Sequence, residues 1–428
     1  MSSHLIRKAT IIQPASRFHN QAVDILIGDG KIRQIGAGLD AGDAAVIEGD
    51  AICVSAGWVD AFADYREPGY EQKETIATGL EAAAAAGFTD VLLAPNTAPP
   101  VDDRGSVQHI LSRAAGHAVS LRPLGALSKG IEGKALAEML DMRAGGAIAF
   151  TDGWQPVQSA QLLLKALEYV KAFGGLVIQI PNDAALAAGG LMNEGPLSTR
   201  LGMPGTPVIA ESLMVHRDIE LLRYTGSRLH LTGISTAESV ALIRKAKEDG
   251  LDITCSVTPY HLALTEAALS SYSSAYKVTP VLRAEEDRKA LLDALLDGTI
   301  DCIATHHRPQ DWDAKEKEFE YAGEGMAVQE TALGILLESI GRVGMKLGLP
   351  RLAEALSEAP RRIFGLKNET IGESASMPLT VFSAAGITRI ERAAAQSLAY
   401  NNPFLGKDLP GRVLGIFSNG TFKASAHG

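Results

Sequence analysis

The sequence has little basic charge, few cysteines and no long apolar run. Its 428 residues include 40 Lys and Arg against 50 Asp and Glu, which gives a formal charge of -10. Proteins that bind a phosphate backbone present clustered basic charge, so we expect no nucleic-acid partner. No apolar stretch approaches the ~18 residues that a membrane-spanning helix needs, and the opening segment MSSHLIRKATIIQ lacks the apolar core of a secretory signal. The sequence therefore predicts a cytoplasmic protein that does not contact a membrane.

The cysteines are too few and too scattered for a disulfide framework or a thiolate metal site. Cys53, Cys255 and Cys302 are an odd number, lie in apolar stretches and show no CxxC spacing. Isolated cysteines of this kind behave as small buried hydrophobic residues. With 46% hydrophobic and 21% charged residues, the composition is that of a folded protein with a large core.

The periodicity of apolar residues divides the chain into strand-rich ends and an alternating centre. Up to residue 56 the apolar runs are short and strand-like, with the turn signal Gly28-Asp29-Gly30 between two of them, which predicts a meander of strands. From Trp58 onward, strand-length runs alternate with helix-length segments. The expected strands of this centre are residues 58–62, 89–94, 120–124, 147–150, 176–180, 228–232, 252–256 and 301–304.

Eight strand-helix units over ~300 residues favour a closed (β/α)8 TIM barrel, because open doubly wound sheets have fewer strands. After Gly365 the pattern becomes strand-like again, in residues 379–382 and 412–418, and ends at the turn Asn419-Gly420. We therefore predict an α/β protein with a barrel over residues 57–366. Residues 1–56 and 367–428 together form a small composite β-sandwich domain in this interpretation.

The carboxyl ends of barrel strands carry the active site in proteins of this fold, and here those ends carry a recognisable set of motifs. The segment DAFADYREPG, residues 60–69, resembles the DxHxHxREPG signature of the dihydroorotases, cyclic amidohydrolases that interconvert dihydroorotate and carbamoyl aspartate in pyrimidine biosynthesis. Further stretches match that family in the same order: APNTAPPVD, FTDGWQPV, LMNEGPLSTRLGMPG, TGISTAESVALIRKAKEDGLDITCSVTPYHL, KVTPVLR, IDCIATHHRPQ and NNPFLGKDLPGRV. The resemblance covers nearly the whole chain.

The resemblance implies a metal-dependent barrel of the amidohydrolase superfamily, but this chain departs from the family at the metal centre. The family takes two His from strand 1, a carboxylate from strand 4, one His each from strands 5 and 6, and from strand 8 an Asp that is also the general base. These six positions fall, in order, on Phe62, Asp64, Asp152, Ile180, Gly233 and His306. Asp152 alone is retained.

Three of the replacements, Phe62, Ile180 and Gly233, have no side-chain lone pair, whereas a catalytic zinc needs about three protein ligands beside its water. Without the metal no hydroxide forms at neutral pH, so we expect no catalytic residue, with His306 standing at the family's general-base position, and no cofactor. An alternative is an active cyclic amidohydrolase in which Asp64, Asp152 and His306 hold one zinc or a similar divalent ion. A third interpretation is a hydrogen-bonded polar cluster without an ion.

The family's substrate-binding side is better retained. Arg66 and Asn96 align with residues that hold the substrate carboxylate, and a guanidinium suits that task because of its bidentate fork. Thr279 stands at the third such position, where the family has Asn. These residues leave open a sensor that binds a carboxylate without turnover, and they also leave open a local ion pair between Arg66 and Asp64.

The leading hypothesis is a catalytically silent dihydroorotase-like protein, a pseudoenzyme. Non-catalytic members of the family accompany aspartate transcarbamoylase, so the resemblance implies its catalytic chain as partner; a homo-oligomer, a dimer, is also expected. In a silent barrel, Asp152→Ala is expected to leave stability nearly unchanged. His4 and His427 are expected at the surface.

Overall fold

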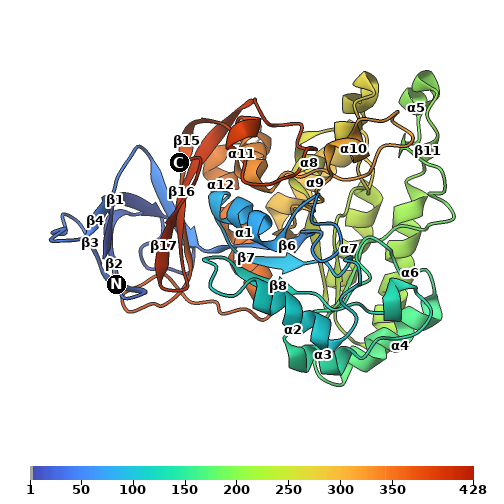
Figure 1. Ribbon diagram of the computed structural model, residues 1–428, viewed down its shortest axis with the longest axis horizontal. Helices are drawn as coiled ribbons and strands as arrows, with labels where there is room; N and C mark the ends of the chain where they lie inside the picture. Colours follow the sequence, from blue (N-terminus) through green and yellow to red (C-terminus); the bar gives the residue numbers. More distant parts are fainter. Residues whose placement is uncertain (1–2, 343) are drawn as a thin grey trace.

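The computed structural model describes residues 3–342 and 344–428, which form a barrel of strands and helices with a β-sheet at one end (Figure 1). The barrel strands are parallel, and seven of them have named bounds: β6 (Trp58–Ala63), β7 (Phe88–Leu93), β8 (Ser120–Pro123), β9 (Val177–Gln179), β12 (Leu229–Leu231), β13 (Ile253–Val257) and β14 (Cys302–Ile303). They fall within the segments predicted from the sequence or overlap them closely. The (β/α)8 fold is confirmed.

The predicted fourth strand is reduced to single bridges around Phe150. That residue bridges Gly125 on one side and Val177 on the other, and its amide donates to Leu176 O at 3.0 Å. On the opposite side of the barrel, the His306 amide donates to Phe62 O and the Asp64 amide to His307 O. The bonds on the two sides join the strand group β6-β7-β8 to the strand group β9-β12-β13-β14 and so close the barrel.

Helices surround the barrel because each buries one apolar face against the strands. The α4 helix buries Leu163, Ala166, Leu167 and Val170, a spacing of three and four residues, and the Ser159 hydroxyl caps its first turn. The larger helices are α1 (Ile76–Ala85), α2 (Arg104–Arg113), α3 (Met139–Gly145), α4 (Ala160–Lys171), α6 (Ile209–Thr225), α7 (Ala237–Glu248), α9 (Glu285–Asp297), α11 (Ala332–Gly341), α12 (Met345–Leu356) and α13 (Glu358–Ile363).

Short elements on the loops complete the barrel: β10 (Met192–Asn193), α5 (Pro196–Leu201), β11 (Gly205–Thr206), α8 (Pro259–Ala263) and α10 (Trp312–Lys315). Within residues 3–342 and 344–428, no helix is both long enough and apolar enough to cross a bilayer. All three cysteines are buried and free, as predicted.

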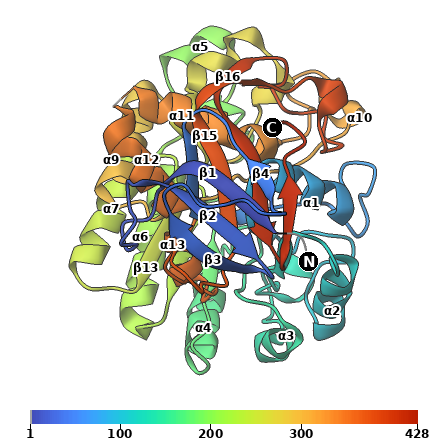
Figure 2. The same ribbon diagram turned by 90° about the vertical axis from the view of Figure 1, so that its left-hand side faces the viewer.

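Both ends of the chain contribute to one eight-stranded sheet, which faces the viewer in Figure 2. Its strands are β1 (His4–Ile11), β2 (Ala22–Gly28), β3 (Lys31–Gly36), β4 (Ala45–Ile47), β5 (Ile52–Ala56), β15 (Leu379–Arg389), β16 (Asp408–Ser418) and β17 (Thr421–Ala424). The hydrogen bonds connect these strands into one continuous sheet, so the small composite β domain built from both termini is present. The amino-terminal strands are also not a simple meander, because β4 and β5 both pair in parallel with β1.

Two tight turns and one long pairing hold this sheet together. Asp29-Gly30 and Asn419-Gly420 have positive φ at both residues, 52° and 71° in the first and 50° and 77° in the second, as two-residue hairpin turns require. Antiparallel pairing of β5 with β15, from Ala56↔Leu379 to Ile52↔Ser383, joins the two ends of the chain. The sheet then lies against the amino-terminal ends of the first barrel strands, where the Trp58 amide donates to the Thr380 hydroxyl at 3.1 Å.

Candidate functional site at the barrel mouth

Three rings pack against one another where the family's metal centre would lie. The Phe62 ring lies 5.2 Å from Trp154 and 5.0 Å from His306, centroid to centroid, and Trp154 and His306 are 5.2 Å apart. Two of the three pairs are edge-to-face, the arrangement that aromatic quadrupoles favour. We call Phe62, Trp154 and His306 the aromatic plug. The plug places aromatic rings at the ligand positions, where a metal-dependent hydrolase of this family needs an ion and water.

His306 fits beside Gly233, so that the two altered ligand positions complement each other. A Cβ added at Gly233 would lie 2.5 Å from His306 Cε1, and Gly233 has φ +74°. A histidine at position 233 therefore cannot coexist with this placement of the imidazole. The two positions form one packing unit in which the smallest residue makes room for the ring.

The imidazole of His306 is buried and held by one partner. Its Nε2 lies 2.8 Å from the Thr232 hydroxyl, while Nδ1 has no hydrogen-bond partner among the described residues. Burial above all, and then the nearby cationic forms of His261, Arg308 and His230, lower the pKa of His306 far below its usual range. A neutral ring packed between two aromatic side chains, with the Thr232 hydroxyl as its one hydrogen-bond partner, is a packing group.

Asp64 occupies the second strand-1 ligand position and is fully engaged by neighbouring donors. It accepts from the Arg66 backbone amide and from Arg66 Nη1, both at 2.9 Å, and from Trp154 Nε1 at 3.0 Å. Both carboxylate oxygens are thus used. The local ion pair left open by the sequence is the one that the structure contains.

Asp152, the retained carboxylate, is turned toward the loop that follows strand β8. It accepts from the Leu127 amide at 3.0 Å, from the Ser128 amide at 2.8 Å and from the Ser128 hydroxyl. Burial raises the pKa of Asp152, and these donors oppose the rise. The expectation that Asp152→Ala is harmless loses its premise, because that change would leave two buried amides without their acceptor.

The remaining aligned positions are also committed to the fold. Ile180 is 1% exposed and belongs to the same apolar cluster as Phe62. Asn96 donates to Asp152 O and accepts from the Trp154 amide, so it fixes the strand-4 loop. The Thr279 hydroxyl donates to Glu324 at 2.7 Å. None of these three side chains is joined to Arg66 by a hydrogen bond.

The residues present do not fit the family's metal. Among residues 3–342 and 344–428, no group of three or more His, Cys, Asp and Glu side chains is placed to hold an ion. Asp64 and Asp152 face different donors, and the three-residue site considered from the sequence is not assembled. The chemistry of the donor set agrees, since Phe62, Ile180 and Gly233 offer no ligand atom.

Two residues of the mouth were not singled out by sequence reasoning. Trp154 contacts both Phe62 and Asp64, and Arg308 stacks over the Trp154 ring with its Cζ 4.5 Å from the centroid. Both lie inside motifs that were compared with the family, FTDGWQPV and THHRPQ. The available signals were the residue types themselves: Trp154 is an aromatic residue two positions from Asp152, and Arg308 is a cationic residue two positions from His306.

Proteins named dihydroorotase are similar to this chain over nearly its whole length. The one from Leifsonia xyli subsp. xyli (strain CTCB07) is 41% identical over 417 residues, which cover 96% of this chain and 94% of the relative. The one from Anaeromyxobacter dehalogenans (strain 2CP-C) is 42% identical over 392 residues, 91% of this chain and 90% of the relative. A family model described as dihydro-orotase-like matches residues 52–239.

Solved structures resemble the chain in fold. An L-hydantoinase (dihydropyrimidinase) from Arthrobacter aurescens superposes with a TM-score of 0.85 at 23% identity, covering 100% of this chain and 97% of that one. A D-hydantoinase (dihydropyrimidinase) from Thermus sp. gives a TM-score of 0.81 at 23% identity, covering 98% and 94%. The barrel and its β domain are therefore a shared architecture.

Proposed function

Since the chain belongs to the dihydroorotase family, we propose that it is a dihydroorotase-like protein without metal-dependent hydrolysis, acting as a structural partner of the aspartate transcarbamoylase catalytic chain. Family membership supports a role in pyrimidine biosynthesis. The loss of catalysis and the binding to aspartate transcarbamoylase are two claims that go beyond family membership. Each claim has its own support and its own test.

The aromatic plug carries the proposal of lost catalysis. Phe62 and His306 stand at two ligand positions and touch each other, and Gly233 stands at a third because His306 takes its space. The three replacements therefore fit one another sterically. Restoring any one ligand alone would clash with the others or leave a polar group among apolar neighbours, so the mouth is built as a core.

The partner rests on the resemblance to non-catalytic dihydroorotase-like chains, and a surface beside the mouth supports it. Trp312 is 57% exposed and Tyr400 is 42% exposed, and the Tyr400 amide donates to Gln310 O at 2.8 Å, so the two aromatic segments adjoin. Exposed Trp and Tyr on neighbouring segments are typical of protein interfaces. We name Trp312 and Tyr400 the rim aromatics.

Catalysis is tested by assaying the purified chain in both directions, with dihydroorotate and with carbamoyl aspartate, before and after addition of Zn²⁺, alongside elemental analysis. We expect no turnover above the buffer rate and metal content well below one ion per chain. Turnover that rises with Zn²⁺ and disappears in Asp152→Asn would contradict the proposal. A related active dihydroorotase assayed in parallel shows that the conditions permit the reaction.

The partner is tested by co-expression with an aspartate transcarbamoylase catalytic chain from the same genome, followed by sizing with light scattering. We expect one complex heavier than either protein, weakened in Trp312→Ala. Tyr224→Ala is a matched control, because Tyr224 is 77% exposed on α6, outside the rim aromatics. Two separate peaks for the unaltered proteins, or equal complex formation by Trp312→Ala, would overturn the partner or its proposed surface respectively.

A further inference from the structure

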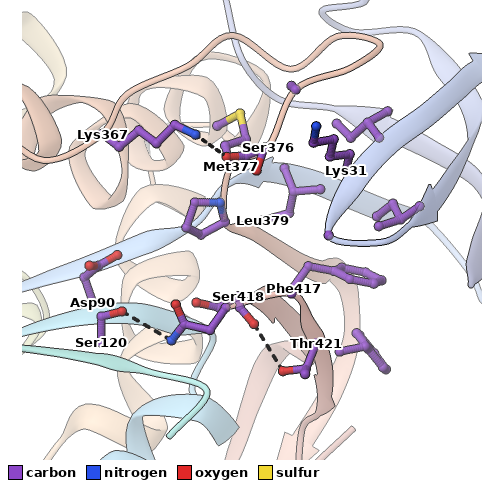
Figure 3. A pocket seen from close by; sticks show the side chains of 18 of the residues that line it. Lys31, Asp90, Ser120, Lys367, Ser376, Met377, Leu379, Phe417, Ser418 and Thr421 are labelled. Carbon is purple, nitrogen blue, oxygen red and sulfur yellow. Dashed lines mark hydrogen bonds between the residues drawn. The ribbon is translucent and has the colours of Figure 1, made fainter. Parts of the chain in front are cut away.

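A hollow lies between the β-sheet and the amino-terminal end of the barrel (Figure 3). Its volume is about 270 Å³, and we call it the seam pocket. The barrel contributes Asp90 of β7 together with Ser120 and Arg122 of β8, while the sheet contributes Lys31 and the turn between β16 and β17. Boundaries between structural units are common places for ligand sites.

Positive charge exceeds negative charge in this pocket. Asp90 is the carboxylate of its lining, and it accepts from two arginines: Arg122 Nε and Nη2 lie 2.9 and 2.8 Å from Oδ1, and Arg361 Nη2 lies 2.8 Å from Oδ2. Two guanidinium groups thus share one carboxylate. Burial foremost, and in addition the like charge of Arg122, lower the pKa of Arg361 despite the counteracting Asp90.

Two lysines add to the excess. In Figure 3, Lys31 and Lys367 lie on either side of Ser376 and Met377. Lys367 is occupied, because its Nζ donates to Ser376 O at 2.6 Å and lies 2.7 Å from a Glu369 oxygen. Lys31 opens strand β3 and is exposed, and within the described part of the chain it belongs to none of the ion pairs. Its ammonium is available to a ligand.

One wall of the pocket is aromatic. The His4 ring lies 5.4 Å from Phe417 and 5.0 Å from Phe422, and the two phenylalanine rings are 4.7 Å apart. All three residues line the pocket. His4 was expected at the surface, but the fold places it in this ring cluster. A planar group can stack there while its charged end reaches the cations on the barrel side.

We propose that the seam pocket binds a small anion that carries one planar ring, an aryl or heteroaryl phosphate or carboxylate. The anion compensates the excess charge of Arg122, Arg361 and Lys31, and the ring packs on His4, Phe417 and Phe422. The volume is just below the ~300 Å³ at which typical ligand pockets begin, so a single ring with one acidic group is the size that fits. The site is independent of the function proposed for the barrel mouth.

The experiment is a titration of the full-length protein with phenyl phosphate, followed by ligand-observed NMR. Inorganic phosphate supplies the charge without the ring, benzyl alcohol supplies the ring without the charge, and benzoate distinguishes a carboxylate from a phosphate. We expect phenyl phosphate to bind roughly tenfold more tightly than either partial probe, because both halves of the pocket contribute.

Two variants separate the two halves of the site. Lys31→Gln should weaken phenyl phosphate by roughly fivefold or more through loss of a charge-assisted bond, and Phe422→Leu should weaken phenyl phosphate but leave inorganic phosphate unchanged. Lys165→Gln is the matched control, because Lys165 is exposed on α4 and, like Lys31, belongs to none of the ion pairs among the described residues. Melting temperatures near that of the unaltered protein show that the variants remain folded.

Several outcomes would overturn the proposal. Equal affinity for benzyl alcohol and phenyl phosphate would mean that the pocket is only an apolar hollow. Equal affinity for inorganic phosphate and phenyl phosphate would mean that the ring of the ligand contributes nothing to binding. Absence of saturable binding of phenyl phosphate and benzoate, or binding unaffected by Lys31→Gln, would contradict the site itself.

Discussion

The two ends of the barrel have been put to opposite uses. At the carboxyl end, where this fold normally places its chemistry, Phe62, Trp154 and His306 pack into a plug and Asp64 is matched by its donors. At the amino-terminal end, the seam pocket stays hollow and holds two guanidinium groups on one carboxylate. Aromatic side chains have replaced metal ligands at the first end, and cationic side chains outnumber the single carboxylate in the pocket at the second.

The comparison teaches that a fold can keep its architecture while its polar site changes position. A site that binds a charged ligand requires buried charge and open volume, both of which cost stability. At the mouth, the aromatic plug occupies ligand positions, and the buried carboxylates of Asp64 and Asp152 accept hydrogen bonds from neighbouring donors. The seam pocket combines open volume with the buried Arg361, and these two features support the ligand proposed for it.

The largest expected effect comes from removing the shared carboxylate of the seam pocket. Asp90→Asn leaves buried Arg361 without its ion-pair partner, and breaking a buried pair in this way costs about 3–5 kcal/mol. Urea unfolding measures the loss. The exposed Asp293 on α9 provides the control change Asp293→Asn, which should cost little. If phosphate but not chloride restores part of the stability of Asp90→Asn, the contrast with the mouth becomes sharper. A loss of stability as small as that of Asp293→Asn would contradict the contrast.

The next effect tests whether the mouth is packed as a core. Gly233→Ala should destabilise the protein by about 3 kcal/mol, since left-handed backbone costs about 1–2 kcal/mol for alanine and the contact with His306 adds overpacking. Unfolding of Gly233→Ala, His306→Ala and the double variant gives the coupling between the two positions. In the His306→Ala background, we expect Gly233→Ala to cost only the free energy of backbone strain, because the overpacking against the imidazole is gone.

Gly174→Ala is the control for that experiment. Gly174 has φ +64° and no heavy atom within 4 Å of an added Cβ, so its change reports backbone strain alone. Equal losses of unfolding free energy in Gly174→Ala and Gly233→Ala would mean that His306 moves aside at little cost and that the aromatic plug is loosely packed.

The smallest effect is a dependence of stability on pH. His306 has its pKa lowered in the folded protein, and burial likewise lowers the pKa of His230 to about 3 and of His261 to about 4. The unfolded chain takes up protons below pH ~6.5 while the folded chain does not, so the free energy of unfolding falls as the pH is lowered through that value.

His306→Leu removes one such proton and should reduce the slope of stability against pH by about 1.4 kcal/mol per pH unit between pH 5.5 and 4.5. Chemical denaturation at several pH values measures the slope, with His109→Gln on the exposed face of α2 as control. An unchanged slope in His306→Leu would mean that the imidazole is protonated in the folded mouth, and that the mouth retains polar character.

The sequence predicted the elements that depend on local chemistry. The alternation of apolar strands with amphipathic helices gave the barrel, and the Asp29-Gly30 and Asn419-Gly420 turns gave two hairpins, because side-chain periodicity and left-handed backbone are properties of short segments. The meeting of both termini in one β domain was predicted, but the pairing of β5 with β15 was not, since it joins residues more than three hundred positions apart.

The candidate site divides in the same way. The loss of ligand atoms at Phe62, Ile180 and Gly233 follows from residue type, whereas the direction in which Asp152 points follows from where the Leu127 and Ser128 amides lie. The His427 imidazole, expected at the surface, is nearly buried against Glu330 at 2.8 Å. No local pattern announced that contact.

By itself, then, the sequence determined the barrel, its family and the absence of a full ligand set, because side-chain chemistry and local periodicity are written residue by residue. The tertiary structure decided that Gly233 makes room for His306, that Trp154 completes the plug, and that His4, Phe417 and Arg122 meet around a hollow. Those outcomes depend on distances between segments far apart in the chain, and such distances exist only once the core has packed.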